Sequence, residues 1–305
     1  MLKASFIALS QSKSLRSVAE KTAIGQRLSR RFVAGVSIEE ALGATRAMNQ
    51  LGLAVSIDNL GENVTNIEEA RRSAELYHQL LAEIDQQKLN ANVSLKLTHM
   101  GLDVDENLAY ELTSSLAAHA LTINNFVRVD MEGSVYTDRT LAFVHRLHRN
   151  AGFAGSVGAV IQSYLHHSEK DVGELLAEGI RIRLCKGAYK EPPEIAFEKK
   201  SDVDANYVKL MKILLKSSIY HGIATHDEKM IRATIDFARQ EQISPASFEF
   251  QMLYGVRRDL QKSLIKDGWR CRVYIPFGME WYPYLMRRLA ERPANAIFIL
   301  KNLFR

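Results

Sequence analysis

Residues 91–132 read ANVSLKLTHMGLDVDENLAYELTSSLAAHALTINNFVRVDME, and this stretch decides the fold. Its two ends, ANVSLKL and NFVRVDME, alternate apolar with polar residues, which predicts β-strands. Between them, residues 106–121 have the apolar spacing of an α-helix. A strand, a helix and a second strand joined by short links form the repeating unit of a parallel sheet.

The same rhythm continues on both sides of this unit. Further strand-like runs are LAVSID (53–58), GSVGAVIQ (155–162), GIRIRLCKG (179–187), GIATH (222–226), SFEFQ (247–251) and CRVYIPF (271–277). Eight strands alternating with helices over about 250 residues predict an α/β fold of the (β/α)8 TIM-barrel type. No Gly-x-Gly-x-x-Gly follows any predicted strand, which weakens the alternative of an open dinucleotide-binding sheet. We assign residues 51–305 to the barrel and residues 1–50 to an N-terminal helical arm.

The composition is that of an ordinary globular protein. The 305 residues are 47% hydrophobic and 25% charged, and no apolar run approaches the roughly 18 to 20 residues of a membrane-spanning helix. Two cysteines, Cys185 and Cys271, exclude a disulfide scaffold and a four-thiolate zinc site. The 40 basic and 35 acidic residues form no long block, so we expect a modest preference for anionic ligands or lipid, and no nucleic-acid partner.

The first 35 residues are strongly basic, because Glu20 is their single acidic residue. The basic residues are Lys3, Lys13, Arg16, Lys21, Arg27, Arg30 and Arg31. This composition suits either a pair of short helices that remain part of the protein or an organelle transit peptide. We favour retained helices, with the transit peptide as the alternative.

Strand periodicity also predicts which side chains enter the barrel. If the apolar faces pack on the helices, charged and polar side chains point inward from every strand. The predicted inward set includes Ser94, Lys96, Arg128, Asp130, Glu132, Gln162, Arg181, Arg183, Glu249, Gln251, Arg272 and Tyr274. Burying so many charges unpaired would cost on the order of several kcal/mol each, so they either pair or surround a polar ligand.

Position along each strand separates these two roles. We expect Arg128, Arg181 and Arg272, near the strand starts, to form an ion-pair network. Another group is expected at the carboxyl ends, where barrel active sites are built, and it comprises Lys96, Asp130, Gln162, Arg183 and Glu249.

A Tyr-x-x-Arg-Arg-x-x-Glu motif follows the last predicted strand, at Tyr284, Arg287, Arg288 and Glu291. On a helix these residues form one polar stripe with two guanidinium groups. Paired guanidinium groups suit bidentate binding of a carboxylate or a phosphate. The motif therefore predicts an anion-binding site near the active mouth of the barrel.

Eight strings in this order resemble the proline dehydrogenase family, and its monofunctional bacterial members in particular. They are SLKLTHMG (94–101), VRVDMEG (127–133), VGAVIQSYL (157–165), RLCKGAYKEP (183–192), IATHD (223–227), FEFQMLYG (248–255), YIPFG (274–278) and YLMRRLAERPAN (284–295). The resemblance implies a distorted (β/α)8 barrel containing FAD. It further implies oxidation of L-proline to Δ1-pyrroline-5-carboxylate by hydride transfer to the flavin, with a membrane quinone as electron acceptor.

The resemblance also implies roles for individual residues. Lys96, Arg287 and Arg288 match positions that grip the proline carboxylate. Tyr274, Tyr284 and Leu184 match positions that pack around the pyrrolidine ring, whereas Asp130 and Arg183 match catalytic positions. Flavin contacts are implied for Met131, Gln162, Arg183, Lys186, Gly187, Ala188, Tyr189, Thr225, His226 and Glu291. No metal is expected, because His226-Asp227 and His166-His167 lack the ligand spacing of a zinc site.

Partners and location are expected from the same resemblance. The second oxidation, to glutamate, would require a separate pyrroline-5-carboxylate dehydrogenase. The expected location is cytoplasmic, peripheral at the inner face of the membrane, with a mitochondrial location as the alternative. Two other functions remain open from the residues alone. One is a flavin-free barrel lyase or hydrolase with Lys96 as nucleophile and Asp130 or Glu132 as base, and the other is a non-catalytic amino-acid-binding barrel.

Overall fold

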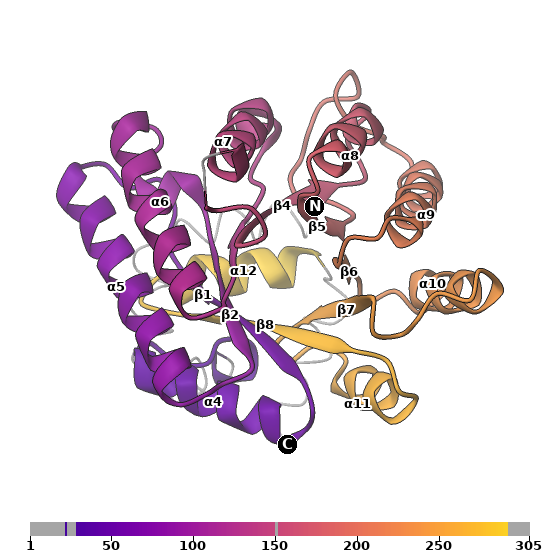
Figure 1. The fold of residues 1–305 in the computed structure, drawn as a ribbon, viewed down its shortest axis with the longest axis horizontal. Helices are drawn as coiled ribbons and strands as arrows, with labels where there is room; N and C mark the ends of the chain where they lie inside the picture. Colours follow the sequence, from indigo (N-terminus) through magenta and orange to yellow (C-terminus); the bar gives the residue numbers. More distant parts are fainter. Residues whose placement is uncertain (1–21, 23–28, 150–151, 292–305) are drawn as a thin grey trace.

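The computed structural model describes residue 22, residues 29–149 and residues 152–291, without the side chains of residues 287–291. Eight parallel strands form a closed barrel whose order around the ring follows the sequence (Figure 1). The strands are β1 (Ala54–Asn59), β2 (Ala91–Leu95), β3 (Val127–Val129), β4 (Val157–Gln162), β5 (Arg181–Cys185), β6 (His221–Ala224), β7 (Phe248–Leu253) and β8 (Cys271–Phe277). The predicted (β/α)8 barrel is confirmed.

Helices connect successive strands on the outside of the ring (Figure 1). They are α5 (Ile67–Gln86), α6 (Glu106–Thr122), α7 (Thr137–Arg149), α8 (Ser168–Ala177), α9 (Lys200–Lys216), α10 (Glu228–Gln240) and α11 (Arg258–Lys266). Several begin at a capping side chain. The carboxylate of Asp105 accepts from two backbone N–H groups of α6, and Asn66 and Asp227 cap α5 and α10.

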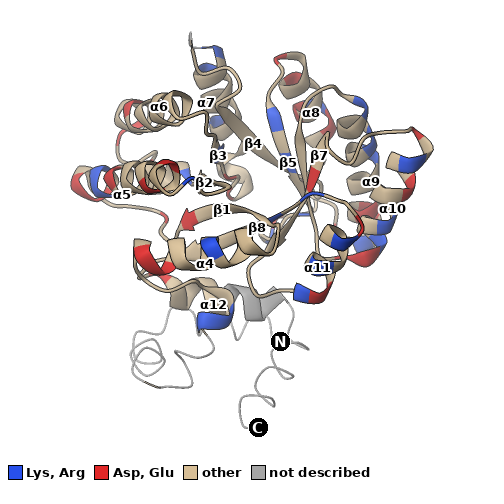
Figure 2. Ribbon diagram, turned by 60° about the horizontal axis from the view of Figure 1, so that its bottom comes forward, with Lys and Arg blue, Asp and Glu red and all other residues tan. Residues whose placement is uncertain are grey.

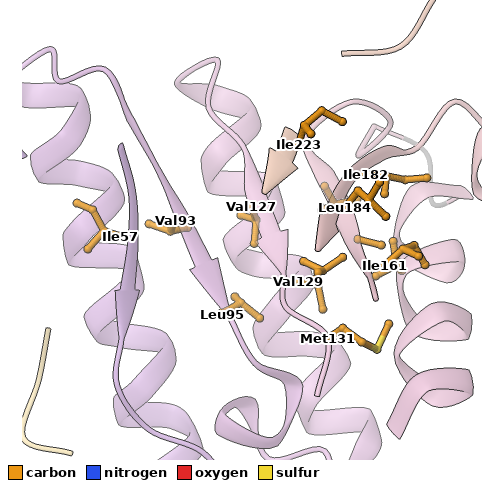
Figure 3. Close-up of a cluster of buried hydrophobic side chains, with 14 of the residues drawn as sticks. Ile57, Val93, Leu95, Val127, Val129, Met131, Ile161, Ile182, Leu184 and Ile223 are labelled. Atoms are coloured by element: carbon orange, nitrogen blue, oxygen red, sulfur yellow. The ribbon is translucent and has the colours of Figure 1, made fainter. Parts of the chain in front are cut away.

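The main hydrophobic core lies between the barrel and its helices. Val93, Leu95, Val127 and Val129 are fully buried on the outward faces of β2 and β3, as Figure 3 shows for these strands and their neighbours. Both faces of these strands are buried, as expected for a parallel sheet covered by helices. The opposite, inward faces carry the polar residues, and Figure 2 shows charged residues on strands β1 and β7.

Two helices depart from a regular barrel. Helix α4 (Ile38–Gln50) precedes β1, yet it contacts both β1 and β8 and so covers the seam where a final barrel helix would otherwise lie. Helix α12 (Trp281–Glu291), which follows β8, is drawn across the middle of the ring in Figure 1. It packs in a second apolar cluster with Leu60, which follows β1, and Val256, which follows β7. The barrel is therefore distorted, with its last helix at the carboxyl ends of the strands.

The predictions for the N-terminus fall mostly outside the described residues. Residues 1–21 and 23–28 are not described, so the choice between retained helices and a transit peptide stays a prediction. The proposed boundary between residues 50 and 51 also stays a prediction, although α4 packs directly on the barrel. Within the described part of the chain, no helix combines the length and apolarity needed to span a bilayer.

Candidate functional site

The carboxylate of Asp130 is the centre of a buried polar cluster inside the barrel. It follows β3 and accepts hydrogen bonds from Ser94 Oγ at 2.7 Å, Arg183 Nη1 at 2.6 Å and Tyr274 Oη at 2.7 Å. These donors come from β2, β5 and β8, on different sides of the ring. The sequence therefore predicted correctly that Asp130, Arg183 and Tyr274 point inward, and the structure brings all three together.

Arg183 is fixed from several directions. Besides Asp130, its guanidinium donates through Nε to Gln251 Oε1 at 2.5 Å and through Nη1 to Ser94 Oγ at 3.2 Å. The guanidinium carbon also lies 5.1 Å from the centre of the Tyr274 ring. Because Arg183 and Asp130 are each about nine-tenths buried, their charges interact in an environment that screens them weakly.

A second charge pair, between Asp58 and Lys96, lies beside this cluster. Lys96 Nζ is 3.4 Å from Asp58 Oδ2. Burial raises the pKa of Asp58 to about 6, although Lys96 partly opposes the shift. Burial lowers the pKa of Lys96, but the nearby carboxylates of Asp58 and Asp130 outweigh this effect and the pKa ends above its ordinary value. Lys96 therefore stays protonated, which disfavours the alternative of an amine nucleophile because that role requires a lowered pKa.

Sequence reasoning missed Asp58, although the alternation in LAVSID contains the signal. Ser56 and Asp58 are polar residues two positions apart on β1, and both are buried. Asp58 pairs in register with Ser94 of β2. The alternation rule applied to β2 and β3 would have placed Asp58 inside the barrel as well.

The prediction that Glu249 belongs to the group at the carboxyl ends was wrong. Glu249 is the second residue of β7, and its Oε1 accepts from Arg272 Nε at 2.6 Å. Tyr220 Oη and Gln251 Nε2 also donate to this carboxylate. Glu249 thus belongs to the network near the strand starts, where Arg272 was predicted. Arg128 of β3 instead donates to two backbone carbonyls, those of Ala159 and Arg181.

The prediction that Leu184 contacts the substrate was also wrong. Arg183 points into the barrel, so its neighbour Leu184 points outward, and it is fully buried in the main apolar core (Figure 3). Met131 lies in the same core, which leaves its backbone for any cofactor contact. An apolar residue that sequence reasoning did not consider, Leu253, does lie on an inward face. It ends β7 on the same face as Gln251, is half-buried, and pairs in register with Tyr274.

Glu132 and Gln162 form a further polar group near the mouth. Glu132 accepts from the backbone N–H of Thr98 at 3.2 Å and from its hydroxyl at 2.7 Å. Gln162 Nε2 donates to the backbone carbonyl of Glu132 at 2.9 Å. Burial raises the pKa of the Glu132 carboxyl despite the two Thr98 donors. The loop after β3 is therefore held to the ends of β2 and β4.

The loop after β5 presents backbone and small side chains at the rim. Gly187, Ala188 and Tyr189 are exposed, and Gly187 has φ +109°, which favours glycine. A Cβ atom on Gly187 would lie 2.2 Å from the ring of Tyr164, so this position has no room for a side chain. Lys186 lies between Asp204 and Asp227, at 2.5 Å and 2.8 Å.

The two predicted residues after β6 are anchored locally. Thr225 is buried, and its hydroxyl accepts from the backbone N–H of Asp227 at 3.1 Å. His226 Nε2 accepts from the backbone N–H of Leu253 at 2.8 Å, which fixes the imidazole at the end of β7. Both residues therefore lie at the carboxyl end of β6, and His226 is tied to the end of the neighbouring strand β7.

The motif after β8 lies on helix α12. Tyr284 is buried in the apolar cluster that holds α12 against the ends of β1 and β7. Arg287, Arg288 and Glu291 belong to the same helix, but their side chains lie outside the described part. Their predicted contacts with a ligand and a cofactor remain predictions.

This arrangement can bind a small anion and orient it. The site contains a lysine, a buried arginine and a tyrosine at the carboxyl ends of parallel strands, each fixed by a carboxylate. The neighbouring rim, from β4 to β6, exposes glycine and backbone groups, which allow close approach by a flat or phosphate-bearing cofactor. Among the described residues, no cluster of three His, Cys, Asp or Glu side chains is suited to a metal ion.

Comparisons with known proteins agree on one family. The family model described as proline dehydrogenase matches residues 41–301. The chain is 40% identical over 306 residues to proline dehydrogenase 1 of Bacillus subtilis (strain 168), and the match covers the full length of both proteins. It is 38% identical to the proline dehydrogenase of Deinococcus radiodurans, covering 96% of this chain and 97% of that protein.

A solved structure supports the same fold. The crystal structure of proline utilization A (PutA) from Bdellovibrio bacteriovorus, inactivated by N-propargylglycine, superposes with a TM-score of 0.83 at 26% identity. The match covers 90% of this chain and 34% of that one, so this chain corresponds to about a third of the larger protein.

Proposed function

Because the chain belongs to the proline dehydrogenase family and oxidises proline in proline catabolism, we propose that FAD is its cofactor and that Asp130 and Arg183 are its catalytic residues. The observation that carries this proposal is the buried contact of 2.6 Å between Arg183 and Asp130 at the carboxyl end of the barrel. The proposed product is Δ1-pyrroline-5-carboxylate.

The proposed substrate contacts come from two sides of the site. Lys96, together with Arg287 and Arg288 on α12, binds the proline carboxylate, while Tyr274 and Tyr284 pack around the ring. Asp58 supports this assignment because it lies 3.4 Å from the Lys96 ammonium group and limits its movement. A carboxylate held at fixed points orients the reacting carbon, an effect that can contribute several kcal/mol.

The proline amine must lose a proton before its neighbouring carbon can release a hydride. Positive charges near the amine lower its pKa through like-charge repulsion. Lys96 and Arg183 are each paired with a carboxylate, which reduces their net effect. We therefore assign most of this effect to Arg287 and Arg288. A pH profile of proline binding in which the amine keeps its solution pKa would contradict this assignment.

The residues of the rim fit a flavin. Gly187 and Ala188 leave the backbone of the β5–α9 loop open to close approach, and Lys186 and Thr225 lie beside it. The proposed contacts are Met131 (through its backbone), Gln162, Arg183, Lys186, Gly187, Ala188, Tyr189, Thr225, His226 and Glu291. When bound, FAD supplies the hydride acceptor at its N5 atom. The chain itself supplies position and charge, with Arg183 held beside the site by Asp130 and Gln251.

Partners are proposed from the same assignment. Electrons would pass to a membrane quinone at a peripheral, cytoplasmic location on the inner face of the membrane, and a separate pyrroline-5-carboxylate dehydrogenase would complete the oxidation. The full-length matches to Bacillus and Deinococcus proline dehydrogenases support this reaction for the chain. Vesicles containing quinone should accept electrons from the protein, whereas the same vesicles without quinone should not.

A single optical experiment tests cofactor and reaction together. The purified protein should show the visible absorbance of oxidised flavin, and anaerobic L-proline should bleach it. D-Proline is the matched control, because it carries the same charged groups but has the opposite configuration at the carbon that bears the carboxylate, so a bound carboxylate would not place the reacting ring carbon correctly. A colourless protein that cannot take up FAD, or a coloured one that L-proline fails to bleach, would refute the proposal.

A further inference from the structure

The β5–α9 loop, which carries Gly187, Ala188 and Tyr189, is held in place by a carboxylate outside the proposed site. Glu191 Oε1 accepts from the backbone N–H of Ser134 at 2.8 Å, and its Oε2 accepts from the Ser134 hydroxyl at 2.5 Å. Ser134 belongs to the loop after β3. One carboxylate therefore joins the ends of β3 and β5.

Tyr164, which follows β4, also contacts the β5–α9 loop. Its N–H donates to Lys186 O at 3.0 Å, its ring fills the space beside Gly187, and its hydroxyl donates to Glu191 Oε1 at 3.4 Å. Burial and then the Glu191 carboxylate raise the pKa of Tyr164, so the phenol remains a hydrogen-bond donor. The loop after β5 is thus fixed by the loops after β3 and β4.

The same contacts place Tyr189. A Cβ atom on Gly133 would lie 4.0 Å from Tyr189 Cδ1 and 3.6 Å from Glu191 Oε1. The Tyr189 ring and the Glu191 carboxylate therefore lie side by side on the segment formed by Gly133 and Ser134. The exposed loop residues are held at the rim by a polar contact rather than by an apolar core of their own.

We infer that Glu191 is a positioning residue, which latches the β5–α9 loop to Ser134 and Tyr164 and so holds Gly187, Ala188 and Tyr189 in the conformation that binds FAD. This inference rests on the proposed cofactor contacts of that loop. Without the latch the loop samples other conformations, and the apparent affinity for FAD falls by the fraction of molecules that remain in the binding conformation.

The test compares variants of the full-length protein by FAD affinity and by amide hydrogen exchange at residues 187–190. Glu191→Ala should raise the FAD dissociation constant about tenfold and speed exchange in this loop, because a charged acceptor with three donors is lost. Ser134→Ala should have a smaller effect, since the backbone donor remains. The double variant Glu191→Ala with Ser134→Ala should resemble Glu191→Ala alone, because both substitutions remove the same contact between Ser134 and Glu191.

Two further variants separate positioning from other effects. Glu191→Gln keeps an acceptor oxygen and the same shape, so it should restore FAD affinity to within about threefold of the parent. Glu194→Ala removes an exposed carboxylate from the same loop and should change neither readout.

Unchanged FAD affinity and exchange in Glu191→Ala, or equal effects in Glu194→Ala, would overturn the inference. A parent protein that binds no FAD would instead refute the proposed cofactor, and the exchange measurement would still test the latch.

Discussion

Removing the Asp130 carboxylate should destabilise the protein, because the positive charge of Arg183 then stays buried without an anionic partner. In Asp130→Ala, the guanidinium of Arg183 stays buried with only neutral acceptors, Gln251 Oε1, Ser94 Oγ and Ser56 Oγ. Breaking a buried ion pair from one side costs about 3–5 kcal/mol of unfolding free energy. At roughly 2 °C per kcal/mol for a chain of this size, the midpoint of thermal unfolding should fall by about 6–10 °C.

Arg183→Met should cost less. Asp130 then keeps its donors from Ser94 and Tyr274, so we expect a loss of about 1–3 kcal/mol. The double variant Asp130→Ala with Arg183→Met removes both charges of this pair, so neither is left buried without its partner. Its loss should be smaller than the sum of the single losses by about 1–3 kcal/mol.

The assay is thermal unfolding followed by circular dichroism, with saturating FAD in every sample. The exposed pair between Lys209 and Glu169, at 2.6 Å, provides the control, and Lys209→Ala should change stability by less than about 1 kcal/mol. Strictly additive losses in the double variant would show that Asp130 and Arg183 are not coupled as described.

Three further outcomes are expected. Arg287→Met or Arg288→Met should raise the KM for proline at least tenfold while flavin content persists, since each would remove a charged contact of about 1.5–3 kcal/mol, and an unchanged KM in both would show the carboxylate site to be misassigned. Gly187→Ala should lower flavin content, because the new Cβ meets the Tyr164 ring and the backbone is left-handed there; full flavin occupancy would argue against that packing. The pH profile of kcat/KM should fall as the pH drops below about 6, where Asp58, whose pKa burial raises, takes up a proton and ceases to be an anionic partner for Lys96. Asp58→Asn should lack this limb, and a limb that persists in the variant would assign it to another group.

The strands and their inward faces could be predicted from the sequence because both depend on local periodicity. Alternation placed Asp130 and Arg183 inside the barrel, and the structure agrees. The same rule, which sends Arg183 inward, sends its neighbour Leu184 outward into the apolar core, where the structure has it. The substrate contact implied for Leu184 by the family resemblance is therefore the one that alternation contradicts.

Other features depend on where each strand begins, which periodicity does not define. Glu249 was expected at the active end, but β7 extends to Leu253 and leaves Glu249 near the opposite end. The bonds of Glu191 to Ser134 and Tyr164 join loops 57 and 27 residues apart in sequence. No local pattern marks such a contact, because it depends on how three loops meet after the barrel has closed.

The arrangement of α4 and α12 divides two tasks that a regular barrel gives to one helix. Because α4, which precedes the first strand, covers the seam between β8 and β1, α12 is not needed to cover that seam. Substitutions of α12 residues outside its buried apolar cluster should then change ligand preference without opening the seam between β8 and β1. Conversely, a protein shortened to begin at β1 would keep the proposed catalytic residues but would expose the apolar surface that α4 covers. We expect this shortened protein to aggregate and to be inactive.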